Sequence, residues 1–239
     1  MFKDLEIAGV EPSSMLERPG YISAIIFLNG CNFRCPFCHN PDLVLKNPDI
    51  KPYPLKEVLK LLKQKKGWVD SVILSGGEPT IYKEIPQFIK KVKDMGFSMG
   101  IHTNGTNPEM IKKLTDRNLL SYLAMDLKND QQDYAKTAGL KKINFFNIQK
   151  TLNIIKSLDR EKIETIVRIT VVPGLIDREN IKKMGGLLKG IKKVSLQQFR
   201  PVNCLDKNFE KIKPYDKLEL NKMADILEQT VEEVERGFI

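Results

Sequence analysis

Six short apolar runs, rich in β-branched residues, alternate with stretches of helical periodicity along this chain of 239 residues. The runs cover residues 21–28, 70–76, 97–103, 122–127, 163–172 and 193–199. Strands that alternate with helices pair in parallel, so the pattern predicts a sheet built from β/α units. Six units are too few for a closed eight-stranded barrel. We therefore expect an α/β fold, a partial (β/α)6 TIM-like barrel of parallel strands with helices outside.

The pattern shows no linker, internal repeat or low-complexity tract. We therefore predict a single domain over residues 1–239, with a core at about 21–201. Near the end of the chain, Asp216 and Glu219 occupy capping-box positions, and an apolar stripe at helical spacing follows them. The stripe predicts a C-terminal helix at about 214–236.

The composition is that of an ordinary globular protein and excludes few classes of function. The chain is 41% hydrophobic and 29% charged, and it contains no run of 18 apolar residues, so no membrane span is expected. No secretory signal is visible, and four cysteines suit a reducing, cytoplasmic setting. The net charge is +9, but the lysines are scattered over predicted helix faces, and no stacking aromatic–basic cluster accompanies them. A nucleic-acid partner is therefore not expected.

Three cysteines lie within eight positions of the loop after the first apolar run: Cys31, Cys35 and Cys38. A structural zinc site needs four ligands, so His39 or the distant Cys204 would have to complete it. The same loop could instead hold three irons of a four-iron, four-sulfur cluster and leave the fourth iron open to another ligand. The spacing alone leaves both a zinc loop and an iron–sulfur cluster open.

Polar motifs follow the later runs, at the edge of the sheet where chemistry collects in such folds. The chain reads SGGEP from Ser75, HTNG from His102 and DLK from Asp126. Arg168 lies inside an otherwise apolar run and needs an anion, either a ligand's carboxylate or that of a neighbouring side chain. Taken singly, the first two motifs could be plain turns and the third a salt-bridged strand end. Arg200 could be a surface residue, and Cys204 an idle thiol.

Together, the cysteine spacing and the motifs resemble the radical S-adenosylmethionine (SAM) superfamily. The resemblance implies a [4Fe-4S] cluster held by Cys31, Cys35 and Cys38, with SAM on the open iron. It also implies that one set of residues binds SAM: Phe37, Asn40, Gly76, Gly77, Glu78, Thr103, Asn104, Asp126, Lys128, Arg168 and Thr170. Within that set, Glu78 would bind the amino group of SAM.

CxxxCxxCHNP, SGGEPT, HTNG, DLK and VRITVVPG resemble one subgroup of that superfamily, the glycyl-radical-enzyme activating enzymes. The likeness implies an oxidoreductase that cleaves SAM reductively and uses the 5′-deoxyadenosyl radical to form a glycyl radical on a partner enzyme. The opening RPGYISAIIFLNGCNFRC is most similar to activators of anaerobic ribonucleoside-triphosphate reductase. A flavodoxin or ferredoxin would supply the electron.

Two positions depart from the subgroup's pattern. His102 stands where the formate-lyase activating type has an aspartate that helps to bind a monovalent cation, and Arg200 replaces a histidine. Two other functions also stay open. One is a radical SAM enzyme acting on a small molecule, a peptide or RNA, and the other is a zinc-stabilised, non-catalytic binding module.

Overall fold

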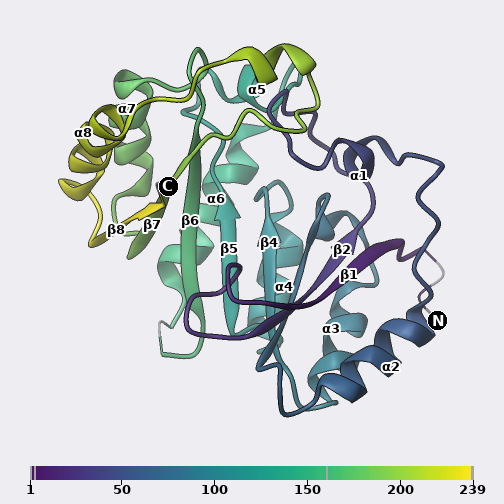
Figure 1. Ribbon diagram of the computed structural model, residues 1–239. Coiled ribbons are helices and arrows are strands. Elements are labelled where there is room, and N and C mark those ends of the chain that lie inside the picture. The colour runs from purple at the N-terminus through teal and green to yellow at the C-terminus, as the bar shows by residue number, and fades with distance from the viewer. Residues whose placement is uncertain (1, 3, 160, 238–239) are drawn as a thin grey trace.

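A computed structural model describes residues 2, 4–159 and 161–237 and shows one eight-stranded sheet whose strand order follows the chain (Figure 1). Strand β1 is antiparallel to β2, and every later neighbour pair is parallel. The strands are β1 (Ile7–Ser14), β2 (Ser23–Leu28), β3 (Ser71–Gly76), β4 (Ser98–Thr103), β5 (Tyr122–Asp126), β6 (Glu164–Val171), β7 (Lys193–Gln198) and β8 (Glu233–Gly237). The α/β fold with a mostly parallel sheet is confirmed, and β2 to β7 coincide with the six predicted runs.

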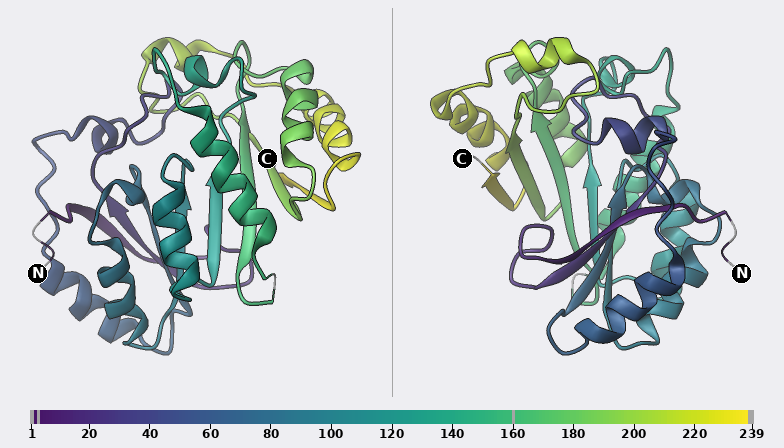
Figure 2. Two further views of the ribbon diagram at one scale, coloured as in Figure 1. Left: turned by 180° about the vertical axis from the view of Figure 1, so that it is seen from behind. Right: turned by 45° about the vertical axis from the view of Figure 1, so that its right-hand side comes forward.

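The main helices cover one face of this sheet (Figure 2, left). Helix α3 shows why: Ile85, Phe88, Ile89 and Val92 are all completely buried against the strands. The helical elements are α1 (Pro41–Leu45), α2 (Leu55–Lys65), η1 (Pro79–Ile81), α3 (Ile85–Lys93), α4 (Pro108–Asp116), α5 (Tyr134–Thr137), α6 (Phe145–Ser157), α7 (Arg178–Leu188), η2 (Lys207–Lys211) and α8 (Lys217–Glu228). The opposite face of the sheet is left for the loops and the cavity described below.

The predicted C-terminal helix is correct only in its first half. The Asp216 side chain accepts a hydrogen bond from the backbone N–H of Glu219 and begins α8, but the helix ends at Glu228. The chain then forms β8, parallel to β7. Lys193 of β7 forms an ion pair with Glu233 of β8, so a sheet contact outweighs the helical periodicity of the last segment.

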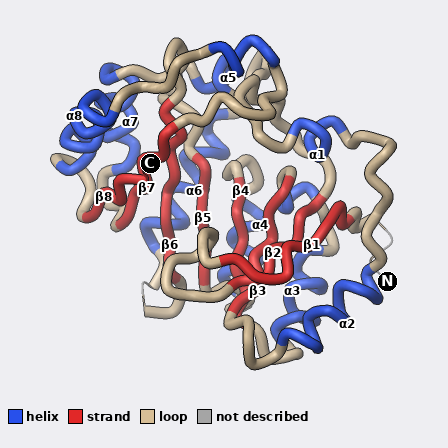
Figure 3. The backbone as a smooth tube through the Cα atoms, viewed as in Figure 1, coloured by secondary structure: helices blue, strands red, loops and turns tan. Residues whose placement is uncertain are grey.

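Strand β1 was also missed, because Gly, Pro and Ser in its sequence weaken the strand signal. Its place is the antiparallel edge of the sheet, where proline is tolerated. The loop from β1 to β2 crosses the amino-terminal ends of the strands (Figure 3). There Arg18 is buried, pairs with Glu164 and lies 3.7 Å from the ring centroid of Tyr21, so this loop closes that end. Among the described residues, no helix is both long and apolar enough to cross a bilayer.

Candidate active site

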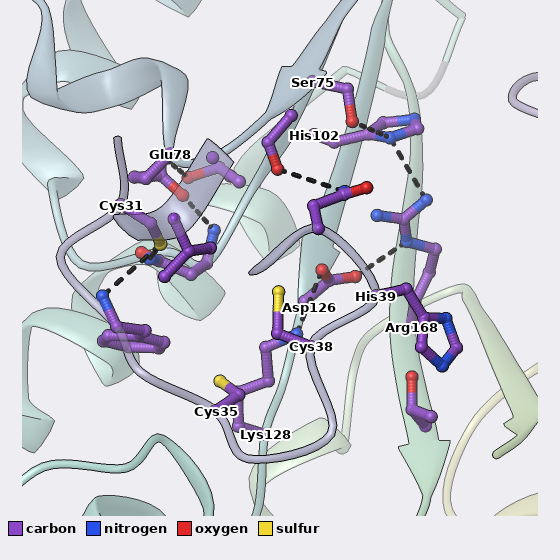
Figure 4. Close-up of a pocket in the computed structure, with 18 of the residues that line it drawn as sticks. Cys31, Cys35, Cys38, His39, Ser75, Glu78, His102, Asp126, Lys128 and Arg168 are labelled. Atoms are coloured by element: carbon purple, nitrogen blue, oxygen red, sulfur yellow. Dashed lines mark hydrogen bonds and ion pairs between the residues drawn. The ribbon is translucent and has the colours of Figure 1, made fainter. Parts of the chain in front are cut away.

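A cavity of about 380 Å³ opens at the carboxyl ends of the central strands, beneath the cysteine loop (Figure 4). This volume lies in the range of sites that bind small molecules. All fourteen residues predicted for the cluster and SAM lie in its wall, although they come from five separate segments of the chain. They are Cys31, Cys35, Phe37, Cys38, Asn40, Gly76, Gly77, Glu78, Thr103, Asn104, Asp126, Lys128, Arg168 and Thr170.

Backbone contacts fix the cysteine loop, residues 31–40, over this cavity. The N–H of Arg34 donates to the carbonyl of Ala138 at 2.9 Å. On another side, the N–H groups of Leu205 and Asp206 donate to the carbonyls of Cys38 and Pro36, at 3.0 and 2.9 Å. The loop is therefore held by segments more than 90 and more than 160 residues away, which fixes the direction of its side chains.

The two glycines of the SGGEP motif allow close packing of the backbone beside the cysteine loop. A Cβ on Gly77 would lie 1.8 Å from the carbonyl oxygen of Gly30, which directly precedes the cysteine loop. Gly76 has φ +103°, and a Cβ there would lie 2.6 Å from the backbone nitrogen of Leu28. Only glycine lets β3 and the start of the cysteine loop come this close.

The three thiols of the loop gather around one space (Figure 4). Burial raises the pKa of Cys31 to about 11 and that of Cys35 to about 12, so these two thiols are protonated at neutral pH. Metal binding would displace these protons. The N–H of Phe33 already points at the Cys31 sulfur at 3.4 Å, a hydrogen bond that favours the thiolate.

The donor set fits a cluster better than a single ion. Among the described residues, no three or more His, Cys, Asp or Glu side chains converge as ligands of one metal ion. A tetrahedral zinc would draw all its sulfur ligands to about 2.3 Å from one point, whereas a [4Fe-4S] cluster binds each thiolate to a different iron. Three thiols spread around a shared space therefore suit three irons.

Glu78 is the most completely satisfied carboxylate of the site. It is 1% exposed, and its Oε1 accepts from the backbone N–H and the hydroxyl of Thr80 and from the hydroxyl of Thr103. Its Oε2 accepts from the N–H of Asn104 at 2.6 Å. Burial raises the pKa of Glu78, and these four donors oppose the rise. The side chain therefore joins the end of β3 to the end of β4 and leaves little acceptor capacity for a ligand.

A chain of amides links the β4 motif to the cysteine loop. Asn104 donates from its side chain to Asn32 at 2.7 Å, and Asn32 donates to the hydroxyl of Thr106 at 2.8 Å. At the other end of the cysteine loop, the side chain of Asn40 lies 3.5 Å from the carbonyl of Gly76, a long hydrogen bond that a ligand could replace. Asn40 thus keeps hydrogen-bonding capacity that Asn104 has used.

Three charged residues form the far wall of the cavity. Asp126 accepts from Arg168 Nε at 2.8 Å through Oδ1 and from Lys128 Nζ at 3.2 Å through Oδ2. Burial by itself would raise the pKa of Asp126, but Arg168 and Lys128 beside it hold the pKa well below its usual range. The anion that Arg168 was expected to need is therefore a neighbouring side chain, Asp126.

Two further residues of this wall, His102 and Glu17, were not predicted to bind a ligand. Nδ1 of His102 lies 3.2 Å from Nη1 of Arg168, 3.3 Å from the Ser75 hydroxyl and 3.4 Å from Glu17 Oε2. Arg168 can only donate, so Nδ1 accepts and the proton resides on Nε2. Burial and Arg168 lower the pKa of His102 well below its ordinary value, so the ring is neutral and its contact with Glu17 is no ion pair.

Seven residues of the cavity wall lay outside the predicted ligand set: Glu17, Phe27, Phe33, His39, Val44, Ser75 and His102. Most of them adjoin a motif residue, and that position could have identified them. Glu17 had no such signal, because it comes from the β1–β2 loop. Conversely, Arg200 and Cys204 do not line the cavity. Arg200 is exposed, its carbonyl pairs with the His39 ring at 2.8 Å, and Cys204 is fully buried.

Residues 25–184, two thirds of the chain, match the family model of the radical SAM superfamily. The chain belongs to the radical SAM superfamily. Enzymes of this superfamily use a [4Fe-4S] cluster and SAM, and the three thiols and the cavity beside them suit both. The match sets aside the reading of the cysteine loop as part of a zinc-stabilised binding module.

Two relatives align with this chain along nearly its whole length. The chain is 31% identical over 231 residues to a pyruvate formate-lyase-activating enzyme of Clostridium pasteurianum, covering 92% of this chain and 90% of that protein. It is 29% identical over 229 residues, 95% of this chain and 94% of the other, to a protein of Methanocaldococcus jannaschii whose name assigns it provisionally to the glycyl-radical enzyme activating enzymes. These relatives confirm the resemblance inferred from the motifs.

Solved structures add support for the fold. The structure of TYW1 with a lysine-pyruvate adduct bound superposes with a TM-score of 0.62 at 20% identity, covering 87% of this chain and 74% of that chain. At this identity the likeness concerns the architecture alone.

Proposed function

We propose that this radical SAM protein is a glycyl-radical-enzyme activating enzyme, an oxidoreductase that generates a glycyl radical on a partner protein. The observation that carries the proposal is the composition of one cavity. A single loop supplies three thiols, and the facing walls supply residues from every motif that resembles the activating enzymes. The relatives that align along nearly the whole chain support the same function.

In this proposal Cys31, Cys35 and Cys38 hold the [4Fe-4S] cluster. When bound, the cluster supplies an electron to the sulfonium of SAM, which is cleaved to methionine and a 5′-deoxyadenosyl radical. The residues of the cavity wall bind and orient SAM: Phe37, Asn40, Gly76, Gly77, Glu78, Thr103, Asn104, Asp126, Lys128, Arg168 and Thr170. Glu78 acts indirectly, since its carboxylate fixes the two strand ends against which SAM would lie.

A glycine Cα in a protein is accessible only if a loop of that protein enters the cavity. The cavity is open between the cysteine loop and the strand ends, while the β1–β2 loop closes the opposite end of the sheet. An entering loop would therefore meet the cysteine loop first. The opening from Arg18 to Cys35 favours an anaerobic ribonucleoside-triphosphate reductase as the partner.

Electron delivery would come from an acidic carrier of the flavodoxin or ferredoxin type. The segments that hold the cysteine loop carry exposed lysines that form no ion pair with any residue the structure describes: Lys136, Lys141, Lys142, Lys211 and Lys213. Both segments contact the cysteine loop, one through Ala138 and the other through Leu205 and Asp206. This lysine rim gives an acidic carrier a charged approach to the cluster.

The activity is tested with anaerobically reconstituted protein, SAM and dithionite. We expect methionine and 5′-deoxyadenosine, and a glycyl radical signal in electron paramagnetic resonance when the anaerobic reductase is added. Cys35→Ser is the matched control and should abolish both. A signal on a formate-lyase-type enzyme alone would reassign the partner. SAM cleavage with no radical on either enzyme would refute the activating role.

The lysine rim is tested by exchanging its charge. The double variant Lys141→Glu/Lys142→Glu should slow SAM cleavage driven by flavodoxin by about tenfold at low salt, because electrostatic steering of that size is lost. Cleavage driven by dithionite should be unchanged. Lys56→Glu/Lys60→Glu on α2, at the far end of the molecule, is the control. Equal flavodoxin rates in both double variants would show that the rim does not guide the carrier.

A further inference from the structure

The side-chain amide of Asn104 lies against the sulfur of Cys31. Asn104 directly follows β4, is 5% exposed and lines the cavity. Its Nδ2 is 4.0 Å from Cys31 Sγ and 2.7 Å from Asn32 Oδ1. One sulfur of the cysteine loop therefore has a side-chain donor beside it, supplied by a residue 73 positions further along the chain.

Thr106 determines which way this amide points. The backbone N–H of Thr106 can only donate, and its nitrogen lies 3.1 Å from Asn104 Oδ1. The hydroxyl of Thr106 donates to the same oxygen at 2.7 Å. The oxygen of the amide is therefore turned toward Thr106, and its NH₂ group must face Cys31 and Asn32.

A closed ring of three hydrogen bonds fixes the plane of this amide. Asn104 donates to Asn32 Oδ1, Asn32 Nδ2 donates to the Thr106 hydroxyl at 2.8 Å, and that hydroxyl donates to Asn104 Oδ1. Each member donates one proton and accepts another, so the three groups are satisfied in one direction around the ring. The ring uses one of the two amide protons of Asn104. The other is left for the sulfur of Cys31.

Cys31 is the thiol of the loop that is surrounded by donors. The backbone N–H of Phe33 points at its sulfur at 3.4 Å, in addition to the amide of Asn104. Without a cluster, the thiol of Cys31 can itself donate to Asn32 Oδ1, 3.9 Å away. Cluster binding removes this proton, and the thiolate then accepts from both N–H donors more strongly than a thiol does.

We infer that Asn104 is a positioning residue for the cluster: its amide donates to the Cys31 sulfur and raises the reduction potential of the bound cluster. Donors to a cluster sulfur stabilise the reduced state, because that state carries one more negative charge. A less negative potential eases electron transfer from the reductant. This role is additional to the place of Asn104 in the wall of the proposed SAM site.

The test compares Asn104→Leu with Asn147→Leu, which makes the same substitution on the other side of Thr106. Asn147 donates to the Thr106 carbonyl at 3.1 Å and does not line the cavity. The reduction potential is measured on reconstituted protein without SAM, by redox titration followed by electron paramagnetic resonance. Asn104→Leu should shift the potential to a more negative value, and Asn147→Leu should leave it unchanged. An unchanged potential in Asn104→Leu, or an equal shift in both variants, would overturn the inference.

If Asn104→Leu retains too little cluster for titration, isotope labelling of the wild-type protein decides. With ¹⁵N in the side-chain amides of asparagine, hyperfine spectra of the reduced cluster without SAM should show a ¹⁵N coupling. The coupling should persist in Asn40→Ala, which removes the other asparagine of the cavity wall. Absence of the coupling, or its loss in Asn40→Ala, would also overturn the inference.

The inference rests on the cluster part of the proposed function only. A failure to activate any glycyl-radical enzyme would therefore leave it standing. A wild-type protein that binds no cluster would instead refute the proposed function itself, and the inference with it.

Discussion

Replacing Glu78 with glutamine tests whether this carboxylate is chiefly a structural junction. Glutamine keeps the shape of the side chain and one oxygen, which can still accept from Thr80 and Thr103. Its amide nitrogen must then occupy the place of Oε2, where the N–H of Asn104 arrives at 2.6 Å. Two donors would face each other in a site that is 1% exposed. The end of β4 would lose its fixed contact with the β3 turn.

The expected cost follows from these contacts. Loss of one charge-assisted hydrogen bond, with a buried N–H left unpaired, costs about 2–3 kcal/mol, and the three remaining bonds weaken by about 0.5 kcal/mol each when their acceptor becomes neutral. Removing a buried charge returns part of this, because burial disfavours the ionised form of Glu78. We expect Glu78→Gln to lower the free energy of unfolding by about 2–3 kcal/mol.

The assay is urea unfolding of the metal-free, reduced protein at neutral pH, followed by circular dichroism. Thr103→Val is the comparison, since it removes one neutral donor to Oε1 and the acceptor of the Gly105 N–H, and it should cost about 1–2 kcal/mol. A Glu78→Gln protein within about 0.5 kcal/mol of the wild type, yet unable to bind SAM after reconstitution, would refute the structural reasoning. The carboxylate would then act mainly as a ligand.

Three further predictions concern the cavity wall and the cysteine loop. The pKa of His102 is lowered in the folded state, so the unfolded chain takes up the proton first as the pH decreases. The free energy of unfolding should therefore decrease as the pH is lowered below about 6.5. In His102→Gln, the melting temperature should decrease less between about pH 6.5 and 5. In urea unfolding, Gly139→Ala should lower the free energy of unfolding by about 3 kcal/mol, because residue 139 has φ +67° and its new Cβ would lie 1.9 Å from a carbonyl oxygen of the cysteine loop. Gly174→Ala is the control. It has φ +81° but open space around the Cβ, so it should cost about 1 kcal/mol. Iron and sulfide analysis after reconstitution should show loss of the cluster in Cys35→Ser and a full complement in Cys204→Ser; equal loss in both would contradict the assignment of the ligands.

The parallel core was predictable because its strands are buried on both sides. Residues 24–26 and 72–74 are at most 3% exposed, and such continuous apolar runs carry a signal that local turn chemistry does not obscure. The edges lacked this signal. In β8, residues 233–237 alternate acidic side chains with few apolar ones, and their parallel pairing with β7, from Lys193 opposite Glu233 onward, makes a strand of them. That contact joins positions forty residues apart and cannot be read from a local window.

The same division applies to the site. Residues at or just after the carboxyl ends of parallel strands had to meet at one edge, so the sequence alone was enough to place Glu78, Thr103 and Asp126 together. Glu17 could not be placed in this way, because its position depends on how the β1–β2 loop folds under the sheet. The chemical roles were less predictable than the positions. Whether Glu78 meets a ligand or four protein donors depends on geometry of a few tenths of an ångström.

The charges of the cavity show why these groups occur together. Without the cluster the thiols of Cys31 and Cys35 are protonated, and Asp126 lies between two cations, Arg168 and Lys128. Loading the site makes all three sulfur ligands thiolates, whose combined negative charge exceeds the positive charge of the iron–sulfide core, so the cavity gains anionic character. Lys128 faces this change, since its ammonium group acts on both Cys31 and Cys35 and favours their ionised forms. The ring of His102 is neutral and does not compensate this negative charge. A cationic ligand beside the cluster would therefore be favoured. A positively charged sulfonium is a ligand of that kind, and the same electrostatics that stabilise the cluster would therefore favour SAM beside it.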